Sequence, residues 1–454
     1  MLDRNASGPS AGITRLATGL DWHGLPPEVR ASARDHLLDT LGVIVAGMPG
    51  EVAQATARVL TASGGGGTVR VPGSELVLSA DAMAFLCGTA AHGIELDDGY
   101  REGTVHPGVA VVPALLALAG TRRVTGPELL TALTVGYEVI CATAAAGHPA
   151  LRQRGFHPTS ATGPLGAAMA SANLLGLDDP TTASALGIAA SHCGGLFAFL
   201  GGGGDVKRLH GGLGARGGLQ AALLAEAGIG APQEVIETGS GYAQAFTGGP
   251  MAFDLPPAGP FRILGCYYKP YACCRHLQPA FEAVIEVMQT QGLRPADVQR
   301  IEVETYAISS HHADVGWDDF ASAQLSFPYL IALAVNRGTA ALSDFDDATR
   351  AAPWVAETAA KLHVRAAPDL DARYPAERPS RVALLTSRGR FTAERAEAAG
   401  SPEYPVTAAM LKDKFLGLTV PVLGQARADS LYDALMSVDT ADDVADLLAL
   451  SAMP

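Results

Sequence analysis

The stretch Glu95-Leu-Asp-Asp-Gly-Tyr-Arg-Glu-Gly-Thr-Val-His-Pro-Gly108 places four acids and one histidine in a glycine-broken segment. Apolar, alanine-rich runs flank it at 82–91 and 109–119, and both are typical of buried helices. Buried charge is costly unless it is paired or used in chemistry. The stretch therefore favours a helical fold with an active-site loop between two helices. The alternative is an ordinary helix end, with an aspartate as cap and the histidine as a hydrogen-bonded core residue.

Three later segments combine the same residue types with a glycine or proline break beside an apolar run. They are Arg154-Gly-Phe-His-Pro-Thr-Ser-Ala-Thr-Gly163, Asp205-Val-Lys-Arg-Leu-His210 and Tyr268-Lys-Pro-Tyr-Ala-Cys-Cys-Arg-His276. Helix N-termini and cationic side chains can hold carboxylates or an enolate-like charge. The repetition favours a shared site for an anionic small molecule.

Hydrophobic periodicity divides the chain into a helical part and a mixed part. Apolar residues recur at helical spacing over 27–46, 113–118, 126–146, 163–175, 181–194 and 213–227. After Gly265 the pattern changes to strands at 300–306 and 380–386, the second turning into a hairpin with 391–396, and to helices at 280–291 and 326–335. Segments 407–415 and 439–450 look helical again.

We therefore expect a mainly α fold with a smaller α+β domain inserted before the C-terminal helices. The expected boundaries are an all-helical domain at 1–264, the α+β domain at 265–402 and a return to the helical domain at 403–454. Glycine and proline near Gly265 and Pro402 would suit hinges for domain closure.

Composition limits the function. The chain of 454 residues is 48% hydrophobic and 17% charged, so it can bury a large core. A net charge of −14 argues against nucleic acid and anionic membranes as partners. We find no apolar run long enough to cross a membrane and no signal-peptide order in residues 1–10, so a cytoplasmic location is expected. The six cysteines lack C-x-x-C spacing, which indicates neither a disulfide framework, a zinc ribbon nor an iron–sulfur cluster.

Two other motifs compete for a functional reading. Gly212-Leu-Gly-Ala-Arg-Gly217 matches the dinucleotide pattern G-x-G-x-x-G, but no strand precedes it, so close helix packing is the favoured interpretation. His311, His312 and Asp314 form a local cluster, and His106 with Asp97 could contribute to another. Neither has a fixed metal-binding spacing, and a solvated loop pair is the favoured reading of the two histidines. We expect no metal and no cofactor.

Six motifs occur in an order that resembles the MmgE/PrpD family, from about Leu37 to Phe415. They are "HGIELDDGY…HPG", "GYEV…RGFHPT…GPLGAA…LLGL", "KRLHGGLGARGGLQAALLA", "KPYACCRH…PA", "QLSFPYLIALA" and "GSPEYPVTAAMLKDKF". That family includes 2-methylcitrate dehydratases, cis-aconitate decarboxylases and iminodisuccinate epimerases. The resemblance implies that the α+β domain is a lid over the helical domain, and that the protein is a homodimer.

The resemblance also implies the site. Its catalytic positions fall on Glu95 or Asp97 with His106, then on His157, Lys207 and His276. Substrate-binding candidates are Glu95, Arg208, His210, Lys269 and Arg275. Histidine has an unperturbed pKa of roughly 6.5, which suits removal of a proton beside a carboxylate. His106 and His276 are the expected bases, Asp97 would orient His106, and Asp98 could instead cap the following turn. Lys207 is the leading cation for the substrate, whereas Arg208 could equally pair with a surface acid.

Three departures from the family pattern bear on the reaction. Glu95 stands where the family commonly has Asp, Gly99 where the decarboxylases have Thr, and Gly108 where Ser usually follows His-Pro. We therefore expect a cofactor-independent lyase or isomerase acting alpha to a carboxylate, most like a 2-methylcitrate dehydratase. The alternatives are an epimerase of an amino- or imino-dicarboxylate, a cis-aconitate-type decarboxylase, and a noncatalytic binding protein on the same fold.

Overall fold

The computed structural model describes residues 8–64, 66–201, 205–256 and 259–453, so most of the glycine run at 201–204 lies outside the described residues. The chain forms two compact units. The first contains the residues up to Gly93, Asp97–Tyr267 and the residues from Thr407, and the second contains Ile94–Leu96 and Tyr268–Val406. We expected the changes of domain after 264 and after 402, and did not expect three residues of the acidic loop to group with the second unit.

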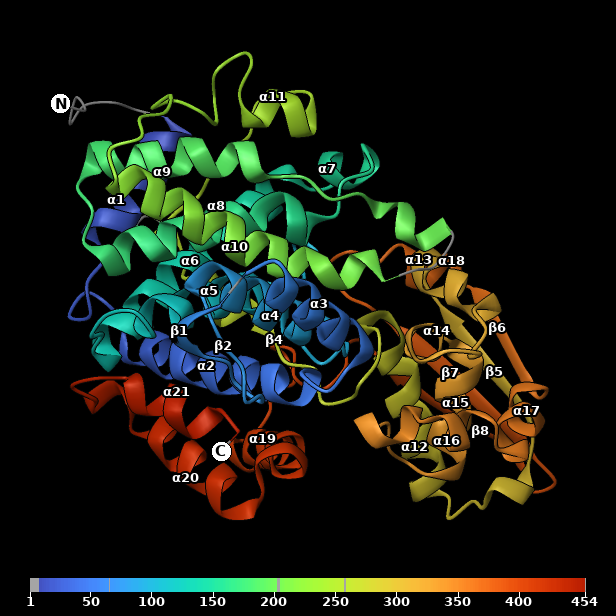
Figure 1. Cartoon of the computed structure of the whole chain (residues 1–454). Coiled ribbons are helices and arrows are strands. Elements are labelled where there is room, and N and C mark those ends of the chain that lie inside the picture. The colour runs from blue at the N-terminus through green and yellow to red at the C-terminus, as the bar shows by residue number, and fades with distance from the viewer. Residues whose placement is uncertain (1–7, 65, 202–204, 257–258, 454) are drawn as a thin grey trace. The chain divides into compact units, whose positions relative to one another are not determined.

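The first unit is built mainly of helices (Figure 1). Its helices are α1 Pro9–Gly19, α2 Pro27–Gly47, α3 Glu51–Ala62, α4 Ala80–His92, α5 Gly108–Ala119, α6 Gly126–Gly147, α7 Ala150–Gln153, α8 Pro158–Leu175, α9 Asp179–His192, α10 Val206–Glu226, α11 Tyr242–Thr247, α19 Ala408–Leu423, α20 Gln425–Met436 and α21 Ala445–Ser451. Helix α6 begins at a capping box in which Thr125 and Glu128 bond each other's backbone amides.

Two short antiparallel ribbons interrupt this helical unit, so the expectation of an all-helical domain was wrong in detail. One pairs β1 Gly66–Arg70 with β2 Val77–Leu78, and the other pairs β3 Gly99–Tyr100 with β4 Cys266–Tyr267. The second ribbon matters for the site, because β3 lies inside the acidic loop. Two-residue strands carry too little alternation to be recognised in a sequence.

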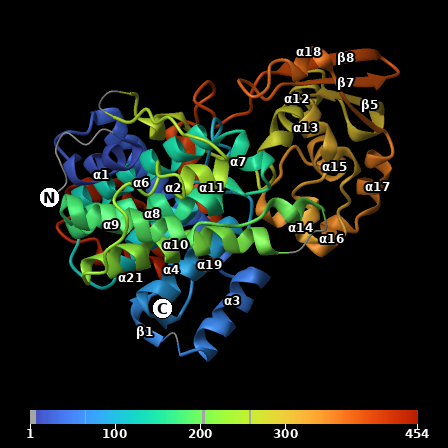
Figure 2. The same ribbon diagram turned by 90° about the horizontal axis from the view of Figure 1, so that it is seen from above.

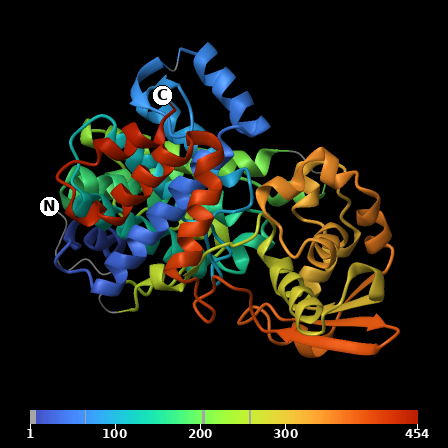
Figure 3. The same cartoon turned by 90° about the horizontal axis from the view of Figure 1, so that it is seen from below.

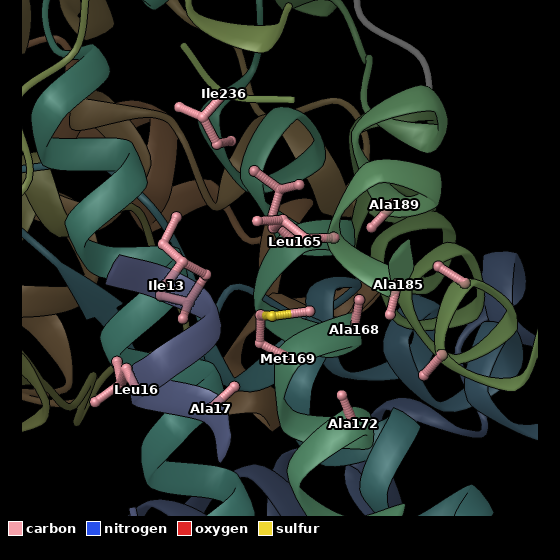
Figure 4. Packing of buried hydrophobic residues seen from close by; sticks show 14 of the residues in the cluster. Ile13, Leu16, Ala17, Leu165, Ala168, Met169, Ala172, Ala185, Ala189 and Ile236 are labelled. Carbon is pink, nitrogen blue, oxygen red and sulfur yellow. The ribbon is translucent and has the colours of Figure 1, made fainter. Parts of the chain in front are cut away.

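The core of the first unit consists of small and medium apolar side chains. Ile13 and Leu16 of α1 pack with Leu165 and Met169 of α8 and with alanines of α9, as Figure 4 shows. Glycines bring α10 against α4: a Cβ on Gly212 would lie 2.2 Å from the carbonyl oxygen of Phe85. The G-x-G-x-x-G motif therefore lies within a helix and serves close packing, as predicted.

Helix α6 is long and apolar enough to cross a membrane, which corrects our expectation that no segment is. Its most apolar window is 89% buried inside the structure. Burial of this kind is typical of a core helix, which is apolar on all sides because other helices surround it.

The C-terminal helices return to the first unit. Helix α19 packs against α2, and α20 contacts both α2 and α19 (Figure 3). Lys414 of α19 and Asp39 of α2 form an ion pair at 2.6 Å between Nζ and Oδ1. The segment after Val406 is thus tied to the N-terminal part of the chain by both apolar and charged contacts.

The second unit is an α+β domain around a four-stranded sheet of order β6-β5-β7-β8. Strand β5 (Val298–Thr305) runs parallel to β6 (Leu362–Ala366) and antiparallel to β7 (Ser380–Thr386), which forms a hairpin with β8 (Gly389–Arg395). Helix α12 (Gln278–Thr290) packs against β7 and β8 (Figure 2), and α15 (Phe327–Asn336) packs against α12. The remaining helices are α13 Ala307–Ser310, α14 Phe320–Ala323, α16 Asp347–Arg350, α17 Pro353–Ala359 and α18 Pro368–Asp371.

Candidate active site

The loop between α4 and α5 carries a carboxylate shared by two histidines. The Oδ2 atom of Asp97 lies 2.7 Å from Nδ1 of His92, the last residue of α4, and 3.2 Å from Nδ1 of His106. Asp97 and His92 are buried, whereas the His106 side chain retains 14% exposure. His106 is therefore the accessible member of this group. The sequence analysis paired Asp97 with His106 but missed His92, which ends an otherwise apolar helix.

A second bond fixes the proton on His106. Its Nδ1 lies 2.6 Å from the backbone carbonyl oxygen of Asp98. Because a carbonyl oxygen can only accept a hydrogen bond, Nδ1 carries the proton, and Nε2 is the basic nitrogen of the neutral ring. The backbone amide of His106 also donates to Thr159 Oγ1 at 3.2 Å.

The carboxylate of Asp98 anchors the same loop through three neighbouring residues. Its Oδ2 accepts from the Tyr137 hydroxyl at 2.7 Å and lies 3.0 Å from His36 Nδ1. Its Oδ1 accepts from the backbone amide of Gly108 at 3.1 Å, at the start of α5. Burial and the neighbouring Asp98 raise the pKa of Tyr137 well above 10, so its hydroxyl stays a donor. Asp98 therefore bonds the first amide of α5, and its buried carboxylate also anchors the loop.

Two glycines in this loop are required by close approach. A Cβ on Gly108 would lie 2.4 Å from Thr40 Oγ1 and 2.8 Å from the Tyr137 hydroxyl. A Cβ on Gly99 would lie 2.4 Å from the hydroxyl oxygen of Tyr267, across the β3–β4 ribbon. Neighbouring side chains therefore leave no room for a side chain at position 99 or 108.

A second pair of histidines lies beside the first. His157 immediately precedes α8, and His210 lies in the second turn of α10; their Nδ1 atoms are 2.9 Å apart. The His157 ring stacks on His92 at 5.7 Å between centroids, and forms T-shaped pairs with Phe197 and Phe199 at centroid distances of 5.2 and 5.4 Å. His157 and His210 are both buried. The structure thus brings His157 and His210 close to Asp97 and His106.

Burial keeps these histidines neutral. It lowers the pKa of His92 to about 3 despite the nearby Asp97, and lowers the pKa of His210 to about 4. Burial, followed by the neighbouring histidines, also holds the pKa of His157 well below 6.5. The positive charge of Lys207 contributes to the lowered pKa of His92 and of His210. Three neutral imidazoles and one cation thus occupy this part of the first unit.

Arg208 takes the alternative role considered for it. Its Nη1 lies 3.1 Å from Oδ1 of Asp205, which is largely exposed. Lys207, one residue earlier in the first turn of α10, acts electrostatically on two buried histidines. Of the two neighbouring cations, Lys207 is the one associated with the histidine cluster.

In the second unit, two predicted substrate-binding residues contact each other. Nζ of the buried Lys269 lies 3.3 Å from Oε2 of Glu95. Glu95 has a φ of 54°, an uncommon conformation for a non-glycine residue. The preceding carbonyl, of Ile94, accepts from Gln324 Nε2 at 2.7 Å, and Gln324 also donates to Ala272. Gln324, within the "QLSFPYLIALA" motif, therefore holds this part of the loop against the second unit.

Arg275 and His276 also have partners within the second unit. The Arg275 guanidinium donates to the carbonyl oxygens of Ala398 and Ala399, at 2.7 and 2.6 Å, and lies 3.7 Å from Glu397. These bonds assign Arg275 a positioning role that the sequence analysis did not foresee. His276 Nδ1 bonds the hydroxyl of Tyr306, which is buried.

The expected solvated histidine pair is only half solvated. His311 is exposed, but His312 Nδ1 bonds the Leu325 carbonyl at 2.8 Å, and its ring stacks near His276 at 6.3 Å. Within the described ranges, no three His, Cys, Asp or Glu side chains are grouped as a metal site would require.

Comparison with known proteins identifies the family of this chain. The MmgE/PrpD N-terminal domain matches residues 11–254, and the MmgE/PrpD C-terminal domain matches residues 271–438. A cis-aconitate decarboxylase of Aspergillus terreus is 26% identical over 100% of this chain and 98% of its own length. The Mus musculus cis-aconitate decarboxylase is 26% identical over 82% of this chain and 78% of its own length, and the Homo sapiens one is 32% identical over 49% and 47%. The two domain matches cover most of the chain in the expected order, and the chain therefore belongs to the MmgE/PrpD family of enzymes.

Proposed function

We propose that this protein is a cofactor-independent enzyme that removes a proton alpha to a carboxylate of a small polycarboxylate. The observation that carries the proposal is the hydrogen bond from His106 Nδ1 to the Asp98 carbonyl oxygen. It makes Nε2 of a partly exposed histidine the proton acceptor. Asp97, at 3.2 Å from the same Nδ1, would stabilise the imidazolium that forms. Lys207 is the proposed partner for a substrate carboxylate or the developing enolate.

Within this class we propose a 2-methylcitrate-dehydratase-like hydro-lyase. Dehydration begins when a base takes the proton from the carbon alpha to a carboxylate. The C–H electrons then form the double bond, and the hydroxyl on the neighbouring carbon takes a proton, from the imidazolium just formed or from the Lys207 ammonium, and leaves as water. The base proposed for this first step is Nε2 of His106, and the three buried imidazoles beside it have lowered pKa values, so they add no positive charge to the site at neutral pH.

Decarboxylation is the second candidate, because full-length relatives are cis-aconitate decarboxylases. That reaction must deliver a proton to carbon after the carboxylate has left, and therefore needs a protonated group. Residue 99, which we expect to be Thr in the decarboxylases, is a glycine here, and Tyr267 fills its place. Dehydration also needs a protonated group for its leaving hydroxyl, so the glycine at 99 is the feature that favours dehydration.

The test is proton NMR in deuterium oxide, with chelator-treated protein supplied separately with 2-methylcitrate and with cis-aconitate. We expect 2-methylcitrate to lose water and its alpha proton to exchange with solvent. Release of carbon dioxide from cis-aconitate without turnover of 2-methylcitrate would instead support the decarboxylase, and activity restored only by a divalent ion would contradict a cofactor-independent reaction.

Variants test the assignment of the base. His106→Asn keeps a hydrogen-bond donor at the position of Nδ1 and lacks Nε2. We expect a loss of roughly 10²- to 10⁴-fold in turnover and exchange. The matched control is His23→Asn, which changes an exposed histidine outside the cluster. Turnover of His106→Asn within threefold of the unaltered protein would remove His106 as the base.

A further inference from the structure

The contact between His157 and His210 is unusual because the Nδ1 atoms of the two rings face each other. Their Nδ1 atoms are 2.9 Å apart, and their ring centroids are 4.9 Å apart with a tilt of 35°. A neutral imidazole has one N–H and one bare nitrogen. At this distance one Nδ1 must carry the proton and the other must accept it. The two rings therefore have complementary tautomers, and a proton moving between them would exchange the two states.

The surroundings of the pair disfavour a charged ring. The rings of Phe197 and Phe199 contact the His157 ring in T-shaped arrangements, and neither histidine of the pair is exposed. The titratable groups that influence them are His92 of α4, His106 and Asp97 of the acidic loop, and Lys207 of α10. Among these, only Asp97 favours a positive charge on His157. A proton accepted by His157 would accordingly be held weakly.

We propose that His210 is the second member of a two-imidazole proton relay with His157. This rests on the proposed function, because the His157 ring stacks on His92, which shares the Asp97 carboxylate with the proposed base His106. When Nε2 of His157 gains a proton from substrate or water, its Nδ1 proton passes to Nδ1 of His210, and His210 then releases its own Nε2 proton to a water molecule. Each ring forms one N–H bond and breaks one. Both finish neutral, so no imidazolium remains in the buried site.

The position of His210 on α10 fits a role in proton transfer. It lies three residues after Lys207, close to one helical turn, and the Lys207 charge disfavours protonated His210. His210 would therefore shed the proton it receives. Its predicted role as a substrate ligand is replaced by a role that acts through His157, because its Nδ1 is already bonded to that ring.

Two substitutions separate a relay from simple positioning. His210→Asn places an amide where Nδ1 was, so it can bond His157 but cannot pass a proton onward. His210→Phe removes the bond as well. A relay predicts that both variants lose roughly 10²-fold or more in solvent exchange at the substrate's alpha carbon. Positioning alone predicts that His210→Asn stays within about threefold of the unaltered protein while His210→Phe fails, which would overturn the relay.

The solvent isotope effect gives a readout that a structural role would not change. The rate is measured in mixtures of light and heavy water. For the unaltered protein, its dependence on the deuterium fraction should show that more than one proton moves in the rate-limiting step, and for His210→Asn that one proton moves. The same dependence in both proteins would contradict the relay. His23→Asn serves as the control for handling and for the loss of a histidine.

Nitrogen-15 NMR of the unaltered protein tests the pair without any substrate. With histidine-labelled protein at neutral pH, we expect one of the two rings to be protonated at Nδ1 and the other to have a bare Nδ1. Two bare Nδ1 atoms, or an imidazolium, would overturn the inference even if a substrate is found. If no polycarboxylate reacts, the proposed function fails, while the tautomer measurement still decides whether the pair is complementary.

Discussion

Replacing His92 by Asn should change the pH dependence of stability in a defined direction. Burial lowers the pKa of His92 to about 3, against an ordinary value of 6.5. Between these values the unfolded chain binds a proton that the folded protein does not bind. The free energy of unfolding therefore falls as the pH drops below 6.5. The stability that comes from keeping His92 neutral is fully present only above pH 6.5. Asn has no titratable group, but its side-chain amide can still donate to Asp97 from the position of Nδ1.

The magnitude follows from the distance between the working pH and the unfolded pKa. At pH 5, which is 1.5 units below 6.5, protonation stabilises the unfolded chain by roughly 2 kcal/mol per histidine, because one unit corresponds to about 1.4 kcal/mol. The folded pKa of about 3 leaves His92 neutral at this pH. The unfolding free energy of His92→Asn, minus that of the unaltered protein, should thus rise by roughly 2 kcal/mol between pH 8 and pH 5.

Urea unfolding followed by the helical circular dichroism signal at pH 5, 6, 7 and 8 would measure this difference. Comparison of the two proteins at each pH removes the contribution of groups that titrate in both, and His23→Asn controls for a histidine outside the cluster. A difference that stays constant within about 0.5 kcal/mol over this range would refute the assignment of His92 as a buried neutral imidazole. A cost that is large but independent of pH would indicate lost packing instead.

In the same urea assay, Gly212→Ala should destabilise the first unit by roughly 1–3 kcal/mol, because the added Cβ would overlap a backbone carbonyl. Gly417→Ala should instead stabilise it by about 0.5–1 kcal/mol, because Gly417 lies in α19 with open space around it. Burial raises the pKa of Glu138 from 4.5 to about 7, so its ionisation favours unfolding as the pH rises between these values. The unfolding free energy of Glu138→Gln minus that of the unaltered protein should rise by roughly 3 kcal/mol from pH 4.5 to pH 8, and a flat difference would contradict the assignment. Arg275→Lys should lower the melting temperature as well as activity, because a single ammonium nitrogen cannot reproduce the planar fork in which two guanidinium nitrogens each bond one carbonyl. An unchanged melting temperature would assign Arg275 to substrate instead.

The fold could be predicted where the sequence pattern follows burial directly. Strands β5 and β7 show enough apolar positions to be recognised, and the β7–β8 hairpin follows from its turn. Strand β6 was missed because it lies at the edge of the sheet and none of its five residues is buried. Helix α10 was expected from residue 213, but it begins at Val206. Several glycines lower helix propensity there, and their packing against α4 outweighs that cost.

The site could be predicted as a set of residue types but not as a set of bonds. The sequence indicated which loops carry histidines, acids and lysines. It could not show that Lys269 contacts Glu95, that His210 bonds His157, or that His92 shares Asp97, because these contacts join segments only through tertiary packing. Glu95 and Lys269 illustrate the limit most clearly, since both looked available for substrate.

Neighbouring Asp97 and Asp98 divide the work of the acidic loop between side chain and backbone. The Asp97 carboxylate contacts two imidazoles directly, so its charge acts on the ring nitrogens. The Asp98 carboxylate is occupied by Tyr137, His36 and the amide of Gly108, and only its backbone carbonyl contacts His106. A carbonyl dictates the tautomer of His106 without adding a second charge, whereas two carboxylates on one ring would favour a permanent imidazolium. The second acid is therefore turned away from the ring of His106.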